Sequence, residues 1–191
     1  MTDTDEIIIS KIRAGDINLY THIVDRYEAK IGRYIRRIVG TGDQSQDILQ
    51  DVFIKVYINI NSFDVDKKFN SWIYRIAHNE CVNFLKKKKS IGFSFFDLDT
   101  FLPAYNLNTD SSTKSQDLIF IEKENKEKIE KALQVLDLKY REVIVMSYFE
   151  DLDYKEISQA LQIPISTVGV RIMRAKKQLQ AILKDANIDT K

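Results

Sequence analysis

The sequence predicts an all-α protein in which two small helical domains are joined by a flexible linker. Only 6 Gly and 2 Pro occur in 191 residues, so breakers of regular structure are few. Residues that favour helices are abundant, and apolar residues recur at spacings of three and four over long runs. One stretch, residues 90–116, has no such period and mixes Gly, Pro, Asn, Ser, Asp and Thr, which is typical of a linker. The expected domains are therefore residues 1–89 and 117–185.

The first domain should begin with two helices. Residues 6–13 form a short helix that ends at Ala14-Gly15-Asp16. A longer helix follows and ends at Gly40. Its buried side repeats at fours and threes through Leu19, Ile23, Tyr27, Ile31, Tyr34 and Ile38. The basic residues between them are adequately explained as a solvated face.

The third predicted helix starts near Asp43 or Ser45 and has two different sides. Its buried stripe consists of Ile48, Val52, Val56 and Ile60, with Leu49 and Phe53 beside them. Another side is a mixed polar surface formed by Asp47, Gln50, Asp51 and Lys55. Periodicity indicates only that this surface is exposed. The polar, turn-forming residues 59–70 then predict a loop.

The fourth predicted helix runs from Phe69 to about Lys87. Its core side is Phe69, Trp72, Ile73, Ile76, Val82 and Leu85, and its polar side is Arg75, Asn79, Asn83 and Lys86. Aromatic residues among Arg, Lys and Asn suit contact with phosphates and stacking on unpaired bases. A core tryptophan and a solvated, lysine-rich helix end explain the same residues equally well.

The linker carries four phenylalanines, Phe93, Phe95, Phe96 and Phe101, which is unusual for a free coil. They either dock on a neighbouring surface or bind a partner, and both alternatives stay open. A helical pattern resumes at about Asp117 and continues through Ile129, Leu133, Leu136, Tyr140, Val143, Ile144 and Met146.

Residues 153–180 predict a helix, a tight turn and a second helix. Asp153 and Glu156 form a capping-box pattern that starts the first helix at Tyr154. Pro164 disfavours helix just before it, so this helix should stop near Leu161 and Gln162. Ser166 or Thr167 can cap the second helix.

The second helix of this pair has an apolar inner face and a cationic outer face. Val168, Ile172, Ala175 and Leu179 form the buried stripe, whereas Ser166, Val170, Met173, Arg174 and Lys177 point away from it. No acidic residue occurs between Ile157 and Lys184. Two such helices are typical of proteins that place a recognition helix in the major groove of DNA. An ordinary amphipathic hairpin with solvated charges is the alternative, and the pattern favours DNA binding.

Several classes of protein are not expected. Cys81 is the only cysteine, which excludes an internal disulfide and makes the cytoplasm the expected compartment. The acidic N-terminus and the short Ile7-Ile8-Ile9 run do not resemble a signal or membrane segment. The chain has no glycine-rich phosphate loop, nucleophile elbow or HExxH motif. We therefore expect no catalytic residue, no metal, no cofactor and no small-molecule substrate.

The chain resembles bacterial RNA polymerase sigma factors of the extracytoplasmic-function (ECF) type in the sigma-70 family. RAGD at residues 13–16, DxxQDVFIKVY at 47–57 and FxxWIYRIAxNxxxNFL at 69–85 resemble region two of that family. The segment from Leu133 to Val168, LxxLDLKYREVIVMSYFEDLDYKEISQALQIPISTV, and RIMRAKKQL at 171–179 resemble region four. Two unrelated motifs in the right order with the right spacer make the resemblance specific.

The resemblance implies roles for three sets of residues. Core polymerase would be bound by Asp47, Gln50, Asp51, Phe53 and Lys55. The minus-ten promoter element, with one base turned out of the melted strand, would be bound by Ser62, Phe63, Lys67, Lys68, Trp72, Arg75, Asn79 and Asn83. The duplex minus-thirty-five element would be bound by Ser166, Thr167, Val170, Arg171, Met173, Arg174 and Lys177. Within this last set, Arg171 and Lys177, together with Lys176, would contact phosphates, and the others would read base edges.

Two residues depart from the family pattern. Gln162 stands in the turn where glycine is common, and a non-glycine residue in left-handed conformation costs roughly 1 kcal/mol or more. Gly169 stands where a lysine or arginine is frequent. The glycine removes a contact with the DNA backbone and lowers helix propensity. Promoter preference therefore cannot be copied from any relative.

The resemblance implies core RNA polymerase and promoter DNA as partners, together with an anti-sigma factor, often membrane-bound, that occludes both domains. A stand-alone helix-turn-helix regulator, with residues 1–89 as a sensor or dimerisation module, is the alternative of a different class. A third alternative is an adaptor that binds polymerase but not DNA.

Overall fold

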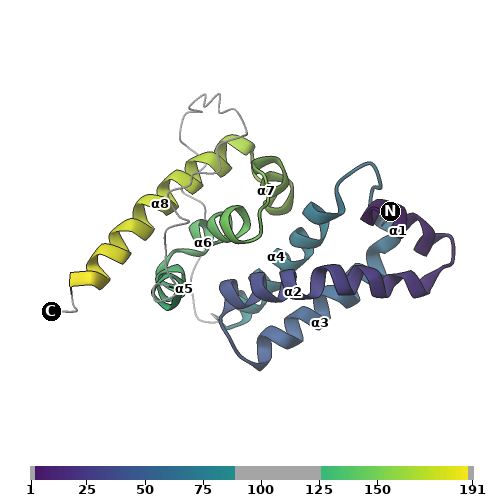
Figure 1. Cartoon of the computed structure of the whole chain (residues 1–191), viewed down its shortest axis with the longest axis horizontal. Coiled ribbons are helices and arrows are strands. Elements are labelled where there is room, and N and C mark those ends of the chain that lie inside the picture. Colours follow the sequence, from purple (N-terminus) through teal and green to yellow (C-terminus); the bar gives the residue numbers. More distant parts are fainter. Residues whose placement is uncertain (1–2, 89–125, 189–191) are drawn as a thin grey trace. The chain divides into compact units, whose positions relative to one another are not determined.

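The structure, a computed structural model, describes residues 3–88 and 126–188 (Figure 1). All regular structure in these two ranges is helical, which confirms the predicted all-α class. The elements are α1 (Asp5–Arg13), η1 (Ile17–Leu19), α2 (Tyr20–Val39), α3 (Asp43–Asn59), η2 (Ile60–Ser62), α4 (Phe69–Lys88), α5 (Lys126–Val135), α6 (Leu138–Ile144), η6 (Val145–Phe149), α7 (Tyr154–Leu161) and α8 (Ile165–Ile188). No helix in these ranges is both long and apolar enough to cross a membrane.

The described residues form two compact units. One comprises residues 3–88 and 155–162, and the other comprises residues 126–154 and 163–188. Both predicted ends of the linker, and its four phenylalanines, lie outside the described residues. The domain boundaries drawn from the sequence therefore stay a prediction.

The core of the first unit lies between α2, α3 and α4, which run side by side with α1 at one end (Figure 1). Fully buried residues come from all three long helices: Ile23, Ile31, Ile35 and Ile38 from α2, Val52 and Val56 from α3, and Phe69, Ile73, Tyr74 and Ala77 from α4. The rings of Tyr34 and Tyr74 meet edge to face, with centroids 5.4 Å apart. The apolar repeats of the sequence thus mark the residues that hold the three helices together.

Glycine ends α2 for a conformational reason. Gly40 has φ 96°, a value that side chains with a Cβ rarely adopt, and its N–H still donates to the carbonyl of Arg36 at 2.9 Å. The predicted loop 59–70 begins differently from expectation, because its first residues continue as the single 3₁₀ turn η2 before the chain opens out.

The core of the second unit is built by α5, α6, η6 and α8. Leu133, Val143, Met146, Val168 and Ala175 are fully or almost fully buried there. α5 begins at Lys126, and the helical pattern predicted for residues 117–125 lies outside the described residues.

The turn between α7 and α8 has the predicted left-handed residue. Gln162 adopts φ 56°, and its side-chain Nε2 donates to the carbonyl of Gln159 at 2.6 Å. α8 begins at Ile165, earlier than predicted, because the carbonyl of Pro164 already accepts from the N–H of Val168 at 3.1 Å. Ser166 and Thr167 therefore lie inside the first turn and do not precede the helix.

Candidate functional site

An open groove of about 620 Å³ lies in the first unit. α3 contributes Lys55 and Asn59 to it, and η2 contributes Ser62. α4 contributes Trp72, Arg75, Ile76, Asn79, Glu80, Val82, Asn83 and Lys86. The α4 positions recur at spacings of three and four, so one face of a single helix forms the longest wall. The groove brings together five of the predicted minus-ten residues: Ser62, Trp72, Arg75, Asn79 and Asn83.

Three aromatic rings support the end of the groove near η2. The Trp72 ring is half-buried, and its centroid lies 5.2 Å from that of Phe63 and 5.6 Å from that of Phe69. Phe63 is only 3% exposed, contrary to the accessible position that its predicted minus-ten contact requires. Because its ring packs behind Trp72 in the core, Phe63 can support the groove wall but does not line it.

The lysines of the loop that follows η2 lie outside this groove. Lys67 and Lys68 are exposed, and neither lines it. Lys67 Nζ lies 3.3 Å from a carboxylate oxygen of Asp64. The pKa of Asp64 is lowered, first by a hydrogen bond from the backbone N–H of Asp66 and then by Lys67. Asp64, Asp66 and Lys67 thus form a local network at the surface of the loop.

Lys55 also differs in position from the residues with which the sequence grouped it. Its Nζ lies 2.6 Å from Oε1 of Glu80, so the pair links α3 to α4 at the groove. Asp47, Gln50 and Asp51 are exposed on α3 and do not line the groove.

The outer surface of α3 contains apolar residues that sequence reasoning missed. Ile54, Tyr57 and Ile58 are 54%, 45% and 68% exposed. With Asp47 and Asp51 they follow spacings of three and four, so they lie along one side of the helix. They lie outside the buried stripe that contains Val52 and Val56, and this position in the repeat could have identified them as exposed apolar residues. We call Asp47, Gln50, Asp51, Ile54, Tyr57 and Ile58 the outer α3 surface.

The predicted minus-thirty-five residues divide by exposure. Ser166, Met173 and Lys177 are exposed, and Thr167, Val170 and Arg174 are half-buried. Arg171 is only 8% exposed, contrary to the accessible position that its predicted phosphate contact requires. Position 171 lies three residues after Val168 and four before Ala175, so it flanks the buried stripe.

The ammonium of Lys176 is also engaged within the second unit, because its Nζ lies 5.0 Å from the centroid of the Tyr148 ring. The exposed cation that remains in the middle of α8 is Lys177, with Arg174 partly accessible beside it.

Comparison with known proteins shows the family. Residues 23–91 match the model of the family Sigma-70 region 2, and residues 126–179 match that of Sigma-70, region 4. The chain is 33% identical over 186 residues to the ECF RNA polymerase sigma factor SigW of Bacillus subtilis (strain 168), which covers 93% of this chain and 95% of that protein. The chain belongs to the sigma-70 family as an ECF sigma factor.

Solved structures share the fold of this sigma factor. The structure of CnrH in complex with the cytosolic domain of CnrY matches with a TM-score of 0.71 and 21% identity, and covers 96% of this chain and 99% of that one. The sigma factor RpoE of Bartonella quintana, in complex with the anti-sigma factor NepR, matches with a TM-score of 0.62 and 19% identity over 86% of this chain and 96% of that one.

Membership of the family decides between the alternatives that the sequence left open. Sigma factors are transcription initiation factors, and the chain matches both family regions, region 2 at residues 23–91 and region 4 at residues 126–179. A stand-alone helix-turn-helix regulator is therefore not favoured. The groove lies entirely within the part that matches region 2, and α8 carries the end of the part that matches region 4.

Proposed function

We propose that the groove between α3 and α4 holds the melted strand of the minus-ten promoter element. The observation that carries this proposal is the composition of the groove wall: Arg75 and Lys86 supply positive charge, Asn79 and Asn83 supply amide donors and acceptors, and Trp72 supplies a ring. Bases stacked on aromatic side chains gain roughly 1–3 kcal/mol each, and amides can bond to base edges.

The dimensions of the groove support the same proposal. A volume of about 620 Å³ is in the range of ligand pockets, and the groove is open to solvent. Turning a base out of a duplex costs a few kcal/mol. A polar hollow beside a ring can offset part of that cost, whereas a flat basic surface would bind duplex and single strand alike.

We further propose that the outer α3 surface docks on core RNA polymerase. Exposed apolar residues grouped along one helix face and bordered by carboxylates mark an interaction surface in a monomer. Ile54 and Ile58 supply the apolar area, and Asp47 and Asp51 supply the charged border. Phe53 is half-buried beside them, and its backbone carbonyl accepts from the hydroxyl of Tyr20 at 2.6 Å, which ties α3 to the start of α2.

In the proposed function α8 binds the duplex minus-thirty-five element. Met173 and Ser166 are exposed on the face opposite the buried stripe, where apolar and hydroxyl contacts to base edges can form. Lys177 would contact a phosphate, and Arg174 a base edge. Arg171 is assigned to support of the helix within the second unit, since it is buried.

We also propose where the protein acts and what regulates it. It acts in the cytoplasm as a subunit of polymerase, without catalytic activity of its own. An anti-sigma factor restrains it by occluding both domains. The anti-sigma partner is supported by the likeness in fold to a sigma factor solved in complex with one.

Transcription reconstituted with core polymerase on a genomic template pool tests the proposal as a whole. The expected result is a small set of transcripts with defined start sites that core polymerase alone does not make. Absence of such transcripts at polymerase concentrations where the complex forms would contradict it.

The docking surface has a sharper test. Asp51→Lys and Ile54→Lys should lower the affinity for core polymerase at least about tenfold. The first places a cation in the acidic border of the surface, and the second places one in its apolar area. Glu28→Lys on α2 is the matched control, since Glu28 is exposed and the substitution makes the same charge change as Asp51→Lys. If Asp51→Lys and Ile54→Lys bind core polymerase as tightly as Glu28→Lys does, the outer α3 surface is not the docking surface.

A further inference from the structure

The side chain of Arg13, at the end of α1, binds the backbone of the segment that forms the end of the groove. Its Nε and Nη2 lie 2.9 and 2.5 Å from the carbonyl oxygen of Ile60, and Nη2 also donates to the carbonyl of Phe63. Ile60 and Phe63 enclose Ser62, which lines the groove. One guanidinium therefore binds the carbonyl of Ile60, which is the C-cap of α3 and the first residue of η2, and the carbonyl of Phe63, which follows η2. The Ile60 carbonyl also accepts from the N–H of Phe63 at 3.4 Å, so the guanidinium strengthens an existing turn.

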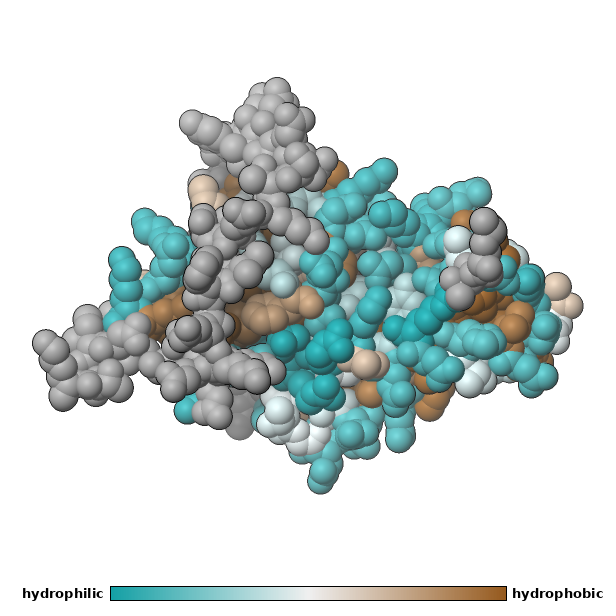
Figure 2. All heavy atoms as spheres, viewed as in Figure 1, coloured by the Kyte–Doolittle hydropathy of each residue, from teal (hydrophilic) through white to brown (hydrophobic). Residues whose placement is uncertain are grey.

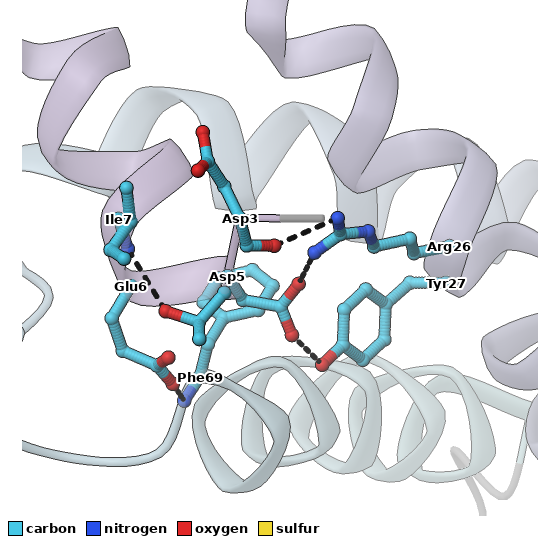
Figure 3. A network of polar contacts seen from close by, with 8 residues as sticks. Asp3, Asp5, Glu6, Ile7, Arg26, Tyr27 and Phe69 are labelled. Carbon is cyan, nitrogen blue, oxygen red and sulfur yellow. Dashed lines mark hydrogen bonds and ion pairs between the residues drawn. The ribbon is translucent and has the colours of Figure 1, made fainter. Parts of the chain in front are cut away.

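A second residue of α1 binds the other end of the same loop. Oε1 of Glu6 accepts from the backbone N–H of Phe69 at 3.1 Å (Figure 3). Phe69 is the first residue of α4, so Glu6 caps the helix that forms the long wall of the groove. A carboxylate at this position is also favoured by the helix dipole.

α1 is itself held firmly against α2. Figure 3 shows the Asp5 carboxylate bonded to both Arg26 and Tyr27. One carboxylate oxygen lies 2.6 Å from Nη1 of Arg26, and the other accepts from the Tyr27 hydroxyl at 2.6 Å. Ile8, Ile9 and Ile12 bury the inner face of α1. The helix is thus a fixed support, and its two polar side chains hold both ends of the loop between η2 and α4.

We infer that α1 sets the shape of the promoter-melting groove, with Arg13 and Glu6 as positioning residues for strand binding. The inference rests on the proposed function of the groove. Neither residue lines the groove, so each acts through the backbone that it holds. Arg13 fixes where η2 places Ser62 and where Phe63 supports Trp72, and Glu6 fixes where α4 begins.

Geometry explains why arginine suits this task. Its planar guanidinium presents several N–H donors in a fixed fork, and two carbonyls three residues apart match that fork. A lysine at position 13 could reach one carbonyl but would hold the pair less rigidly. Loss of these bonds should disturb the groove end, where Phe63 packs against Trp72, more than the packing of α2, α3 and α4.

The test uses holoenzyme assembled from core polymerase and the full-length chain, with a fluorescent single-stranded oligonucleotide of a promoter that the wild type opens. The variants are Arg13→Gln, Arg13→Lys and Glu6→Ala. Lys11→Ala is the matched control on the same helix, because Lys11 forms an exposed ion pair with Asp3 that touches neither end of the loop. Affinity for core polymerase and the thermal unfolding midpoint are measured in parallel.

Arg13→Gln should weaken oligonucleotide binding about tenfold, as expected for loss of hydrogen bonds from a charged donor, while core binding changes less than about twofold. Arg13→Lys should retain part of the binding, and Glu6→Ala should show a smaller loss in the same direction. Lys11→Ala should bind as the wild type does.

Three outcomes would overturn the inference. The first is Arg13→Gln binding the oligonucleotide as tightly as the wild type does. The second is an equal loss of oligonucleotide and core binding, which indicates a general contribution to stability. The third is a loss in Lys11→Ala as large as that in Arg13→Gln. Failure of the wild-type holoenzyme to bind the strand would instead contradict the proposed function of the groove.

Discussion

Nζ of Lys55 lies 2.6 Å from Oε1 of Glu80, and the pair joins α3 to α4 at the groove. The resemblance to the family had grouped Lys55 with the polymerase-binding residues, but in the structure it lines the groove proposed for DNA. Lys55→Ala should therefore weaken single-strand binding about fivefold at low salt, because it leaves the Glu80 carboxylate uncompensated beside phosphates. Fluorescence anisotropy with holoenzyme measures this.

Substitutions of Lys55 and of Glu80 should change the affinity for single-stranded DNA in opposite directions. Glu80→Gln removes the acidic group and leaves the Lys55 cation, so strand affinity should rise and its dependence on salt should steepen. If Lys55→Ala instead lowers affinity for core polymerase and leaves strand binding unchanged, Lys55 belongs to the docking surface.

Gly169 offers a stabilising substitution in α8. A Cβ added there would lie 3.7 Å from Cε2 of Tyr154, which is an ordinary contact distance. Gly169→Ala should raise the free energy of unfolding of the second unit by about 0.5–1 kcal/mol, because alanine has less backbone freedom to lose. Urea unfolding followed by circular dichroism measures the change.

Gly40→Ala is the matched comparison for that substitution. A Cβ added at Gly40 would meet no atom within 4 Å, but the φ of 96° is unfavourable for alanine, so the same chemical change should destabilise the first unit. A destabilised Gly169→Ala variant would mean that the helix needs glycine at position 169.

Tyr27 predicts how the first unit responds to alkaline pH. Burial, followed by the hydrogen bond to Asp5, raises the pKa of Tyr27 above the usual 10.0. The folded state then keeps a proton that the unfolded state loses, so this contribution is complete below pH 10.0 and is lost as the pH rises above it. The melting temperature should fall more steeply above that pH in the wild type than in Tyr27→Phe, and parallel pH profiles would contradict this.

Arg174 and Lys177 separate base readout from phosphate contact. Arg174→Ala should relax sequence preference at one position of the minus-thirty-five element, with a cost of about 1–3 kcal/mol for the preferred base. Lys177→Ala should weaken binding equally across sequences and reduce the salt slope by about one. Binding to a duplex library at two salt concentrations measures both effects, and identical profiles for the two variants would contradict the division.

Periodicity and turn chemistry were sufficient to predict most of the fold. The repeats ending at Ile38 and Ile60, the glycine stop at Gly40 and the left-handed Gln162 are local features, and each is specified by a few nearby residues. The start of α8 was less predictable. The sequence offered Ser166 or Thr167 as the cap, but the carbonyl of Pro164 accepts the first helical hydrogen bond, so the helix begins earlier.

Several residues of the groove could be predicted from the sequence, but the full set of lining residues and the contacts that shape the groove could not. Spacing predicted the polar part of its α4 wall, Arg75, Asn79, Asn83 and Lys86. Trp72, Ile76 and Val82 were assigned to the core side of the helix, but they are half-buried and line the groove as well. The burial of Phe63 and Arg171 and the partnership of Lys55 with Glu80 depend on contacts between elements. The bonds from Arg13 to Ile60 join residues 47 apart, and no local pattern specifies such a pair.

The most direct test of the central claim is permanganate footprinting of promoter opening by the reconstituted holoenzyme. It compares the wild type with the Asn79→Ala, Asn83→Ala double variant, whose substitutions lie in the groove and away from the outer α3 surface. The wild type should open a defined stretch at the minus-ten element, and the double variant should bind core polymerase and the same promoter but leave it closed. Opening by the double variant equal to that by the wild type would contradict the assignment of the groove to the melted strand.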